Sequence, residues 1–150
     1  MARQWLIAPI FIPHEGCPYR CVFCNQKEIS GSKRHADREN VERELNTYLK
    51  GIPLNRLPKH REVAFYGGSF TGLPADRQEY LLSLVQPWID EGFIHSIRLS
   101  THPLFIDENR LALLKKYRVK TIELGIQSTD PEVLRVSRRE CRMETIRNAV

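Results

Sequence analysis

The chain has 150 residues and a formal net charge of +5, and 41% of its residues are hydrophobic. This length supports one domain with a buried core, and no stretch reaches the roughly 18 apolar residues of a membrane-spanning helix. The apolar run 5–13 lacks the basic flank and small-residue cleavage site of a signal peptide, so we expect a cytoplasmic protein with no membrane partner.

Strands and helices are predicted to alternate along the chain. Short apolar runs that end at turn residues predict four strands, at residues 5–13, 62–66, 96–100 and 121–126. The first of these strands is expected to be buried. Capping residues and helical apolar spacing predict helices after Asp37, at 76–89, after Asp107, after Asp130 and at 143–150. Alternation of this kind indicates an α/β fold, with parallel strands joined by helices.

Two details of this pattern are expectations for the structure to test. The helix after Asp107 is expected to bury Leu111, Leu114 and Tyr117. The final predicted helix stops without a Gly, a Pro or a polar tail, and four parallel strands leave a sheet edge unpaired. We therefore expect one domain, residues 1–150, that is incomplete at its C-terminus, and a longer reading frame in the source would support this expectation.

Three of the four cysteines lie within eight residues, as Cys17, Cys21 and Cys24 in the spacing C-x3-C-x2-C. In a reducing compartment such a cluster indicates metal binding rather than disulfides. Three thiolates satisfy three irons of a 4Fe-4S cluster and leave the fourth iron open for another ligand. The alternative is a structural zinc site, for which His14 is the candidate fourth ligand.

The segment Cys17–Cys24, with an aromatic residue before its last cysteine, resembles the signature of the radical S-adenosylmethionine (SAM) superfamily. The flanking residues Pro13–Gly16, Asn25-Gln26 and Ile29–Gly31 resemble more narrowly the Elongator-catalytic-subunit-like branch. Oxygen-independent coproporphyrinogen III oxidases are similar but more distant. True Elongator subunits have a longer gap between the first two cysteines and an acetyltransferase domain, and this chain has neither.

The resemblance implies a partial triosephosphate-isomerase-type barrel, a 4Fe-4S cluster on the three cysteines, and SAM on its open iron. It places Phe23 near the SAM adenine. It also implies an electron donor such as flavodoxin or ferredoxin. The reaction implied is reductive cleavage of SAM to a 5′-deoxyadenosyl radical that takes a hydrogen atom from a substrate.

Functional-looking residues follow each later strand. Gly67, Gly68 and Ser69 resemble the glycine-rich segment that holds the SAM amino group. Ser100 and Thr101 at the end of the third strand, and Gln127 after the fourth, match family positions that the resemblance places near SAM. The carboxyl ends of parallel strands meet at one rim of a barrel, so these residues are expected to gather there.

Two residues depart from the family pattern. His102 stands where Elongator-like relatives tend to have an arginine, and it is either a SAM-site residue or a surface loop residue. Cys141 lies where relatives show a Gly-His pair, and it is expected to be an inert or substrate-side thiol.

Basic residues are scattered along the chain and are expected mainly to form a solvated surface, with a combined patch for RNA as the other interpretation. The leading hypothesis is a radical SAM enzyme that acts on tRNA or on a small metabolite, although the chain alone is expected to bind its cluster weakly and turn over little. The alternative is a non-catalytic iron–sulfur or zinc module that binds RNA. A third hypothesis is a truncated frame without function.

Overall fold

A computed structural model describes residues 4–25, 36–139 and 141–150. Parts of the family-like motif, Gln26 and Ile29–Gly31, lie outside the described residues. Two of the scattered basic residues, Lys33 and Arg34, lie outside them as well.

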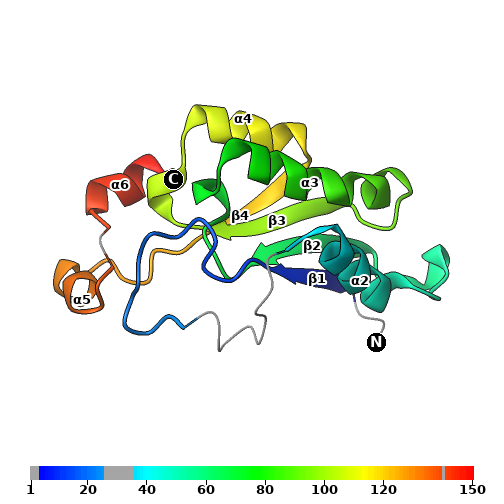
Figure 1. Ribbon diagram of the computed structural model, residues 1–150, viewed down its shortest axis with the longest axis horizontal. Helices are drawn as coiled ribbons and strands as arrows, with labels where there is room; N and C mark the ends of the chain where they lie inside the picture. The colour runs from blue at the N-terminus through cyan, green and yellow to red at the C-terminus, as the bar shows by residue number, and fades with distance from the viewer. Residues whose placement is uncertain (1–3, 26–35, 140) are drawn as a thin grey trace.

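The sheet has four parallel strands in the order of the sequence (Figure 1). They are β1 (Trp5–Phe11), β2 (His60–Tyr66), β3 (Ser96–Thr101) and β4 (Val119–Leu124). The register between β3 and β4 shifts at Ile97 and Arg98. Parallel neighbours joined by helices confirm the α/β fold class and the partial barrel.

The strands are connected by α2 (Arg38–Leu49), α3 (Ala75–Asp90) and α4 (Glu108–Lys116). Two shorter helices, α5 (Pro131–Val136) and α6 (Met143–Asn148), follow β4. Short 3-10 turns are η1 (Leu54–Arg56), η2 (Phe70–Gly72) and η3 (Pro103–Phe105). The caps predicted at Asp37, Asp107 and Asp130 are confirmed, because each carboxylate accepts a backbone N–H of the first turn of its helix.

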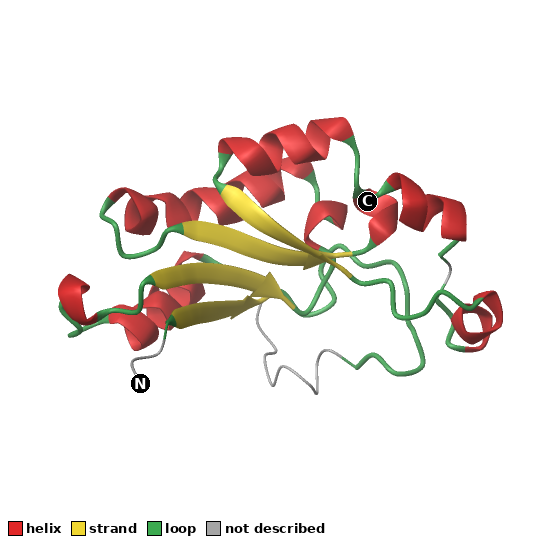
Figure 2. Ribbon diagram, turned by 180° about the vertical axis from the view of Figure 1, so that it is seen from behind, coloured by secondary structure: helices red, strands yellow, loops and turns green. Residues whose placement is uncertain are grey.

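Helices cover one face of the sheet, and the strands face the viewer when the molecule is seen from behind (Figures 1 and 2). The core lies between the two layers. From the strands it takes Val63, Phe65, Ile97 and Leu99, all fully buried. The helices contribute Val41, Leu45, Leu81, Leu82, Val85 and Leu114.

Two burial predictions are wrong. The first strand is not buried throughout, since Trp5 is 53% and Phe11 38% exposed. β1 lies at a sheet edge, and its second face has no helix against it. Leu111 is 41% exposed, whereas Leu114 is buried as predicted. α4 packs over β4, and the structure describes no strand beyond β4 that would cover a second apolar position.

The sheet face away from the helices carries a charged network instead of an apolar layer. Arg98 binds Glu62 at 2.8 Å and Glu123 at 2.6 Å. Tyr66 donates to Glu123 at 2.9 Å, and Ser96 donates to Glu62 at 2.9 Å. The carboxylate of Glu62, although its side chain is only 8% exposed, is therefore paired and hydrogen-bonded.

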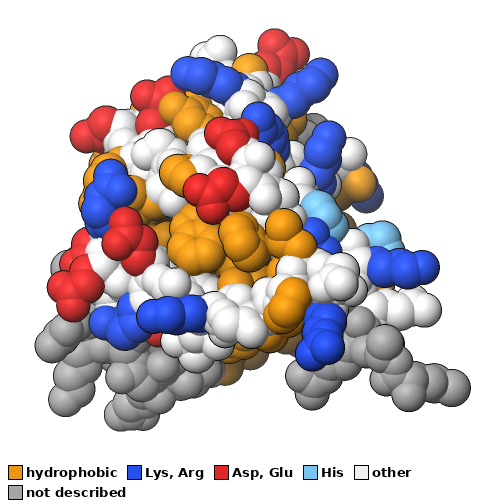
Figure 3. Space-filling model, turned by 90° about the vertical axis from the view of Figure 1, so that its right-hand side faces the viewer, with side chains coloured by type: hydrophobic (Ala, Val, Ile, Leu, Met, Phe, Trp, Pro, Cys, Tyr) orange, Lys and Arg blue, Asp and Glu red, His pale blue; other side chains and the backbone are white. Residues whose placement is uncertain are grey.

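The end of the molecule opposite the cysteine loop has a different surface. Figure 3 shows hydrophobic side chains gathered in the middle of this face, with charged side chains around them. Within the described residues, no helix has the length and apolar character needed to cross a bilayer.

Candidate active site

The carboxyl ends of the strands and the cysteine loop enclose one cavity of about 320 Å³. Its lining residues come from the cysteine loop, from the segments after β2, β3 and β4, and from the segment after α5. They are His14, Cys17, Phe23, Cys24, Gly67, Gly68, Ser69, Ser100, Thr101, His102, Gly125, Gln127 and Arg139. Every site residue predicted from the sequence, except Cys21, therefore lines this single cavity.

Backbone hydrogen bonds fasten the cysteine loop to the glycine-rich segment. The His14 N–H donates to the Gly67 carbonyl at 2.9 Å, and the Ser69 N–H donates to the Glu15 carbonyl at 2.9 Å. A Cβ on Gly68 would lie 2.4 Å from the Glu15 carbonyl oxygen. The missing side chain at Gly68 thus lets the cysteine loop itself approach closely, which is a structural need separate from any ligand.

The three loop cysteines differ in environment. Cys17 and Cys24 are half-buried and line the cavity, whereas Cys21 is 6% exposed and lies outside the lining. Burial raises the pKa of the Cys17 thiol, so this group stays protonated at neutral pH until a metal displaces the proton.

The donor set fits a 4Fe-4S cluster in its chemistry. Three thiols on one loop supply one ligand to each of three irons. No three described His, Cys, Asp or Glu side chains lie close enough together to hold a single metal ion. A cluster differs from a single ion in this respect, because each iron takes its own thiolate.

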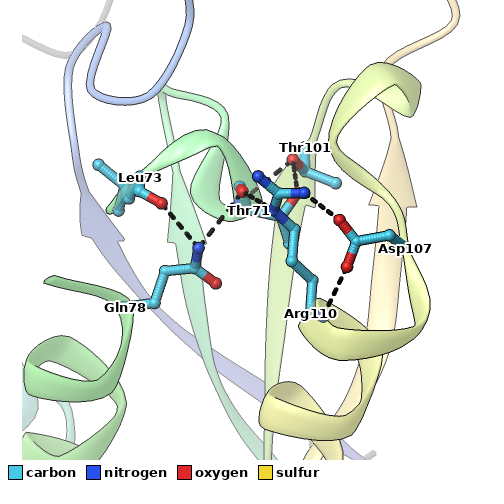
Figure 4. Close-up of polar contacts among 6 residues, drawn as sticks. All are labelled: Thr71, Leu73, Gln78, Thr101, Asp107 and Arg110. Atoms are coloured by element: carbon cyan, nitrogen blue, oxygen red, sulfur yellow. Dashed lines mark hydrogen bonds and ion pairs between the residues drawn. The ribbon is translucent and has the colours of Figure 1, made fainter. Parts of the chain in front are cut away.

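The Thr101 hydroxyl is the centre of a buried network at the end of β3. It lies 3.1 Å from the Ser69 hydroxyl and 2.5 Å from the Thr71 hydroxyl, and it accepts the Thr71 N–H at 3.3 Å. Figure 4 shows Gln78 and Arg110 directed at Thr71, whose carbonyl accepts from Gln78 at 3.3 Å and from Arg110 at 2.8 Å. These bonds fix the segment after β2 against the end of β3.

His102 is 2% exposed, so the expectation of a surface loop residue is wrong. Its Nδ1 accepts the Leu104 N–H at 3.0 Å, which leaves the proton of the neutral ring on Nε2. That Nε2 is buried and has no hydrogen-bond partner among the described residues. Burial, together with the smaller effect of the Arg139 charge, lowers the pKa of His102 to about 4, so the ring is neutral at physiological pH.

Arg139 is the site residue that the sequence did not single out. In the sequence it is one of many scattered basic residues, yet in the structure it is 8% exposed and lines the cavity. Its Nη2 donates to the Gly125 carbonyl, and its Nη1 lies 3.8 Å from the Cys21 sulfur. The position of Arg139 in the sequence favours a place in the cavity lining. It follows the motif that contains Gln127 at the end of the fourth strand by a short segment, and such segments lie at the rim of the barrel.

A second and larger cavity, of about 1070 Å³, adjoins the first through Arg139. It lies among the cysteine loop, η3, α5 and α6. Its lining includes four arginines and several apolar residues: Tyr19, Leu104, Pro131, Leu134, Arg135, Arg138, Arg139, Cys141, Arg142, Met143 and Thr145. Cys141 therefore faces a cavity next to the predicted cofactor site.

Some of the other basic residues are part of the ordinary surface. Lys116 pairs with Glu79 at 3.4 Å, and Arg118 pairs with Asp90 at 2.5 Å, with all four side chains largely exposed. Four arginines, by contrast, gather around the larger cavity.

The fold and the site define an α/β protein of partial-barrel type with a cysteine loop at the carboxyl rim of its strands. The Radical SAM superfamily model matches residues 11–150, so the chain belongs to the Radical SAM superfamily. This family generally binds a 4Fe-4S cluster and SAM, and membership supports enzyme activity in general.

Solved structures include a similar chain, the archaeal Methanocaldococcus infernus Elp3 with an N-terminal deletion. The TM-score is 0.60 at 15% identity, over 99% of this chain and 35% of that chain. The chain thus spans about a third of the length of that protein, and the likeness concerns the fold. No curated protein sequence matches the chain.

Proposed function

We propose that the chain binds a 4Fe-4S cluster and SAM in the 320 Å³ cavity and serves as the cofactor-binding part of a radical SAM enzyme. The supporting observation is that the predicted motif residues from four separate segments line one cavity. When bound, the two cofactors supply an electron to cleave SAM and a 5′-deoxyadenosyl radical to abstract hydrogen from a substrate.

The cysteines Cys17, Cys21 and Cys24 are the proposed cluster ligands. Around the SAM portion of the cavity, the backbone of Gly67 and Gly68 is proposed to hold the amino group, and Phe23 to lie against the adenine. Further polar contacts are assigned to Ser69, Ser100, Thr101 and Gln127.

The Ser100 side chain is the more available of the two hydroxyls at the end of β3. Ser100 is only half-buried, whereas the Thr101 hydroxyl is already engaged with Ser69 and Thr71. Among the described residues that line this cavity, Arg139 is the only Lys or Arg, so it is the proposed counter-charge for the SAM carboxylate.

The proposed electron donor is a small redox protein such as flavodoxin or ferredoxin, in keeping with a cytoplasmic location. The proposed substrate is RNA, with a small metabolite as the other candidate. The larger cavity supports RNA, because guanidinium groups bind phosphate well and four arginines line the cavity together with Tyr19.

Anaerobic reconstitution with iron and sulfide, followed by SAM and dithionite, tests the cofactor assignment. We expect about four irons per chain, a spectrum of the reduced cluster that changes when SAM is added, and 5′-deoxyadenosine above background. Cys21→Ala is expected to lose iron and product, whereas Cys141→Ala keeps both because Cys141 lies outside the cluster loop.

The alternative of a non-catalytic module makes a different prediction in the same experiment. A stable zinc centre, or a cluster whose spectrum ignores SAM, would contradict the proposed function and favour that module. Equal product from wild type and Cys21→Ala would show that the cysteine loop is not the site of the chemistry.

A further inference from the structure

Arg139 connects two parts of the site that lie far apart in the sequence. It follows α5, and its guanidinium reaches the Cys21 sulfur, 118 residues earlier in the chain, at 3.8 Å. The same group donates to the carbonyl of Gly125 at the exit of β4. The cysteine loop is fastened at this point by backbone too, since the Val22 N–H donates to the Ser137 carbonyl at 3.1 Å.

The positive charge of Arg139 is buried and is not balanced by a described carboxylate. The side chain forms no ion pair with any Asp or Glu that the structure describes, and its Nε has no hydrogen-bond partner there. The neighbouring titratable side chains are Cys21, Cys141 and His102. Burial is the main cause of the pKa shifts at two of them: it lowers the pKa of His102 and raises the pKa of Cys141. The charge of Arg139 acts to lower the pKa of both groups.

A buried cation of this kind requires a compensating anion. The side chain that it touches is Cys21, and a cysteine binds iron as a negatively charged thiolate. A cluster held by three thiolates carries negative charge, and reduction adds one more electron. Positive charge and hydrogen bonds at the sulfurs therefore favour the reduced form and raise the reduction potential.

We propose that Arg139 is a positioning residue for the cluster: it holds the Cys21 sulfur and raises the reduction potential of the cluster bound there. This inference rests on the proposed function, because it requires that the loop bind a cluster. It assigns to Arg139 an effect on the cluster itself, which is separate from any contact with SAM and is measurable in the absence of SAM.

The test is a redox titration of the reconstituted chain, monitored by the electron paramagnetic resonance signal of the reduced cluster, without SAM. Arg139→Gln removes the charge, Arg139→Lys keeps it without the planar fork, and Arg43→Gln is the control. Arg43 lies on α2 with its side chain 50% exposed, away from the cavity lining. Iron content and thermal unfolding are measured on each variant.

We expect the midpoint potential of Arg139→Gln to shift to more negative values, with Arg139→Lys intermediate and Arg43→Gln equal to wild type. A purely structural role would lower the iron content but leave the potential of the remaining clusters unchanged, and that result would overturn the proposal. If Arg139→Gln holds no cluster, Arg139→Lys decides: a more negative potential supports the proposal, and the wild-type potential overturns it.

Failure of this inference differs from failure of the proposed function. If wild type itself binds no iron–sulfur cluster, the proposed function is wrong and this inference falls with it. If wild type binds a cluster and responds to SAM while Arg139→Gln keeps the wild-type potential, only the role of Arg139 is wrong.

Discussion

The rings of Tyr19 and His102 are in contact, tilted by 32° with their centroids 4.8 Å apart, which joins the middle of the cysteine loop to the end of β3. Phe105 meets His102 in an edge-on arrangement, with the two ring centroids 6.0 Å apart. An imidazolium in this place would be desolvated and would lie near the charge of Arg139. The contact therefore depends on a neutral His102, and this dependence links the order of the loop to pH.

The first prediction concerns the pH dependence of stability. The pKa of His102 is about 4 in the folded chain, and an unfolded histidine has a pKa of about 6.5, so the unfolded chain binds more protons between these values. The free energy of unfolding is therefore expected to fall as the pH drops from about 6.5 to about 4, by at most about 3 kcal/mol from this group. Urea denaturation across this range measures the slope.

His102→Asn is the matched variant, because its amide oxygen keeps an acceptor for the Leu104 N–H and does not titrate. Its slope between pH 4 and 6.5 is expected to be smaller than that of wild type. His95 also has a lowered pKa, mainly through burial, so the variant retains part of the slope. Identical slopes in the two proteins would show that His102 is not the group responsible.

The second prediction concerns the buried hydroxyl network. Thr101→Val keeps the shape of the side chain but leaves Ser69 and Thr71 without a shared partner. We expect a loss of about 1–3 kcal/mol in the free energy of unfolding, measured by urea denaturation. Ser83→Ala, which removes an exposed hydroxyl on α3, is expected to change stability by less than about 0.5 kcal/mol. Equal effects of the two substitutions would contradict this interpretation.

The elements could be predicted from the sequence because their signals are local. The capping aspartates Asp37, Asp107 and Asp130 marked helix starts that the structure confirms. The motif residues were expected at one rim because they follow parallel strands, and they line one cavity. Their roles toward cofactors stay predictions.

What the sequence could not provide depends on contacts between distant residues. The burial of Arg139 could not be predicted, because charge alone does not distinguish a buried arginine from a surface one. The pairing of Arg98 with Glu62 and Glu123 depends on strand register, which a single sequence leaves undetermined. Leu111 has the spacing of a core residue, but its exposure depends on what lies beyond β4.

The third prediction separates crowding from backbone strain at two glycines. In Gly68→Ala the new Cβ would meet the carbonyl oxygens of Glu15 at 2.4 Å and Ile12 at 2.6 Å, so the cysteine loop must move. We expect a loss of about 1–3 kcal/mol in stability and a clear drop in iron bound after reconstitution. Urea denaturation and iron analysis measure the two effects.

Gly51→Ala is the control for Gly68→Ala. Gly51 has a φ of +79° and open space around its Cβ position, so alanine there costs only backbone strain, about 1 kcal/mol. Because Gly51 follows α2 and lies outside the cavity lining, iron binding should be normal. A Gly68→Ala protein with normal iron content would show that the loop tolerates the added methyl group.

The fourth prediction concerns the charged network on the open face of the sheet. Arg98→Met leaves the Glu62 carboxylate, with its side chain 8% exposed, without its cation. Since Arg98 itself keeps 21% exposure, we expect a loss of about 3 kcal/mol, the low end for a broken buried pair. Adding Glu62→Gln removes the unpaired charge while its amide oxygen still accepts from Ser96, so the double variant should recover more than half of the loss.

Arg118→Met is the control: it breaks an exposed pair with Asp90 and should cost at most about 1 kcal/mol in the same urea denaturation experiment. A double variant no more stable than Arg98→Met would mean that the stability comes from packing of the Arg98 side chain and not from neutralising Glu62.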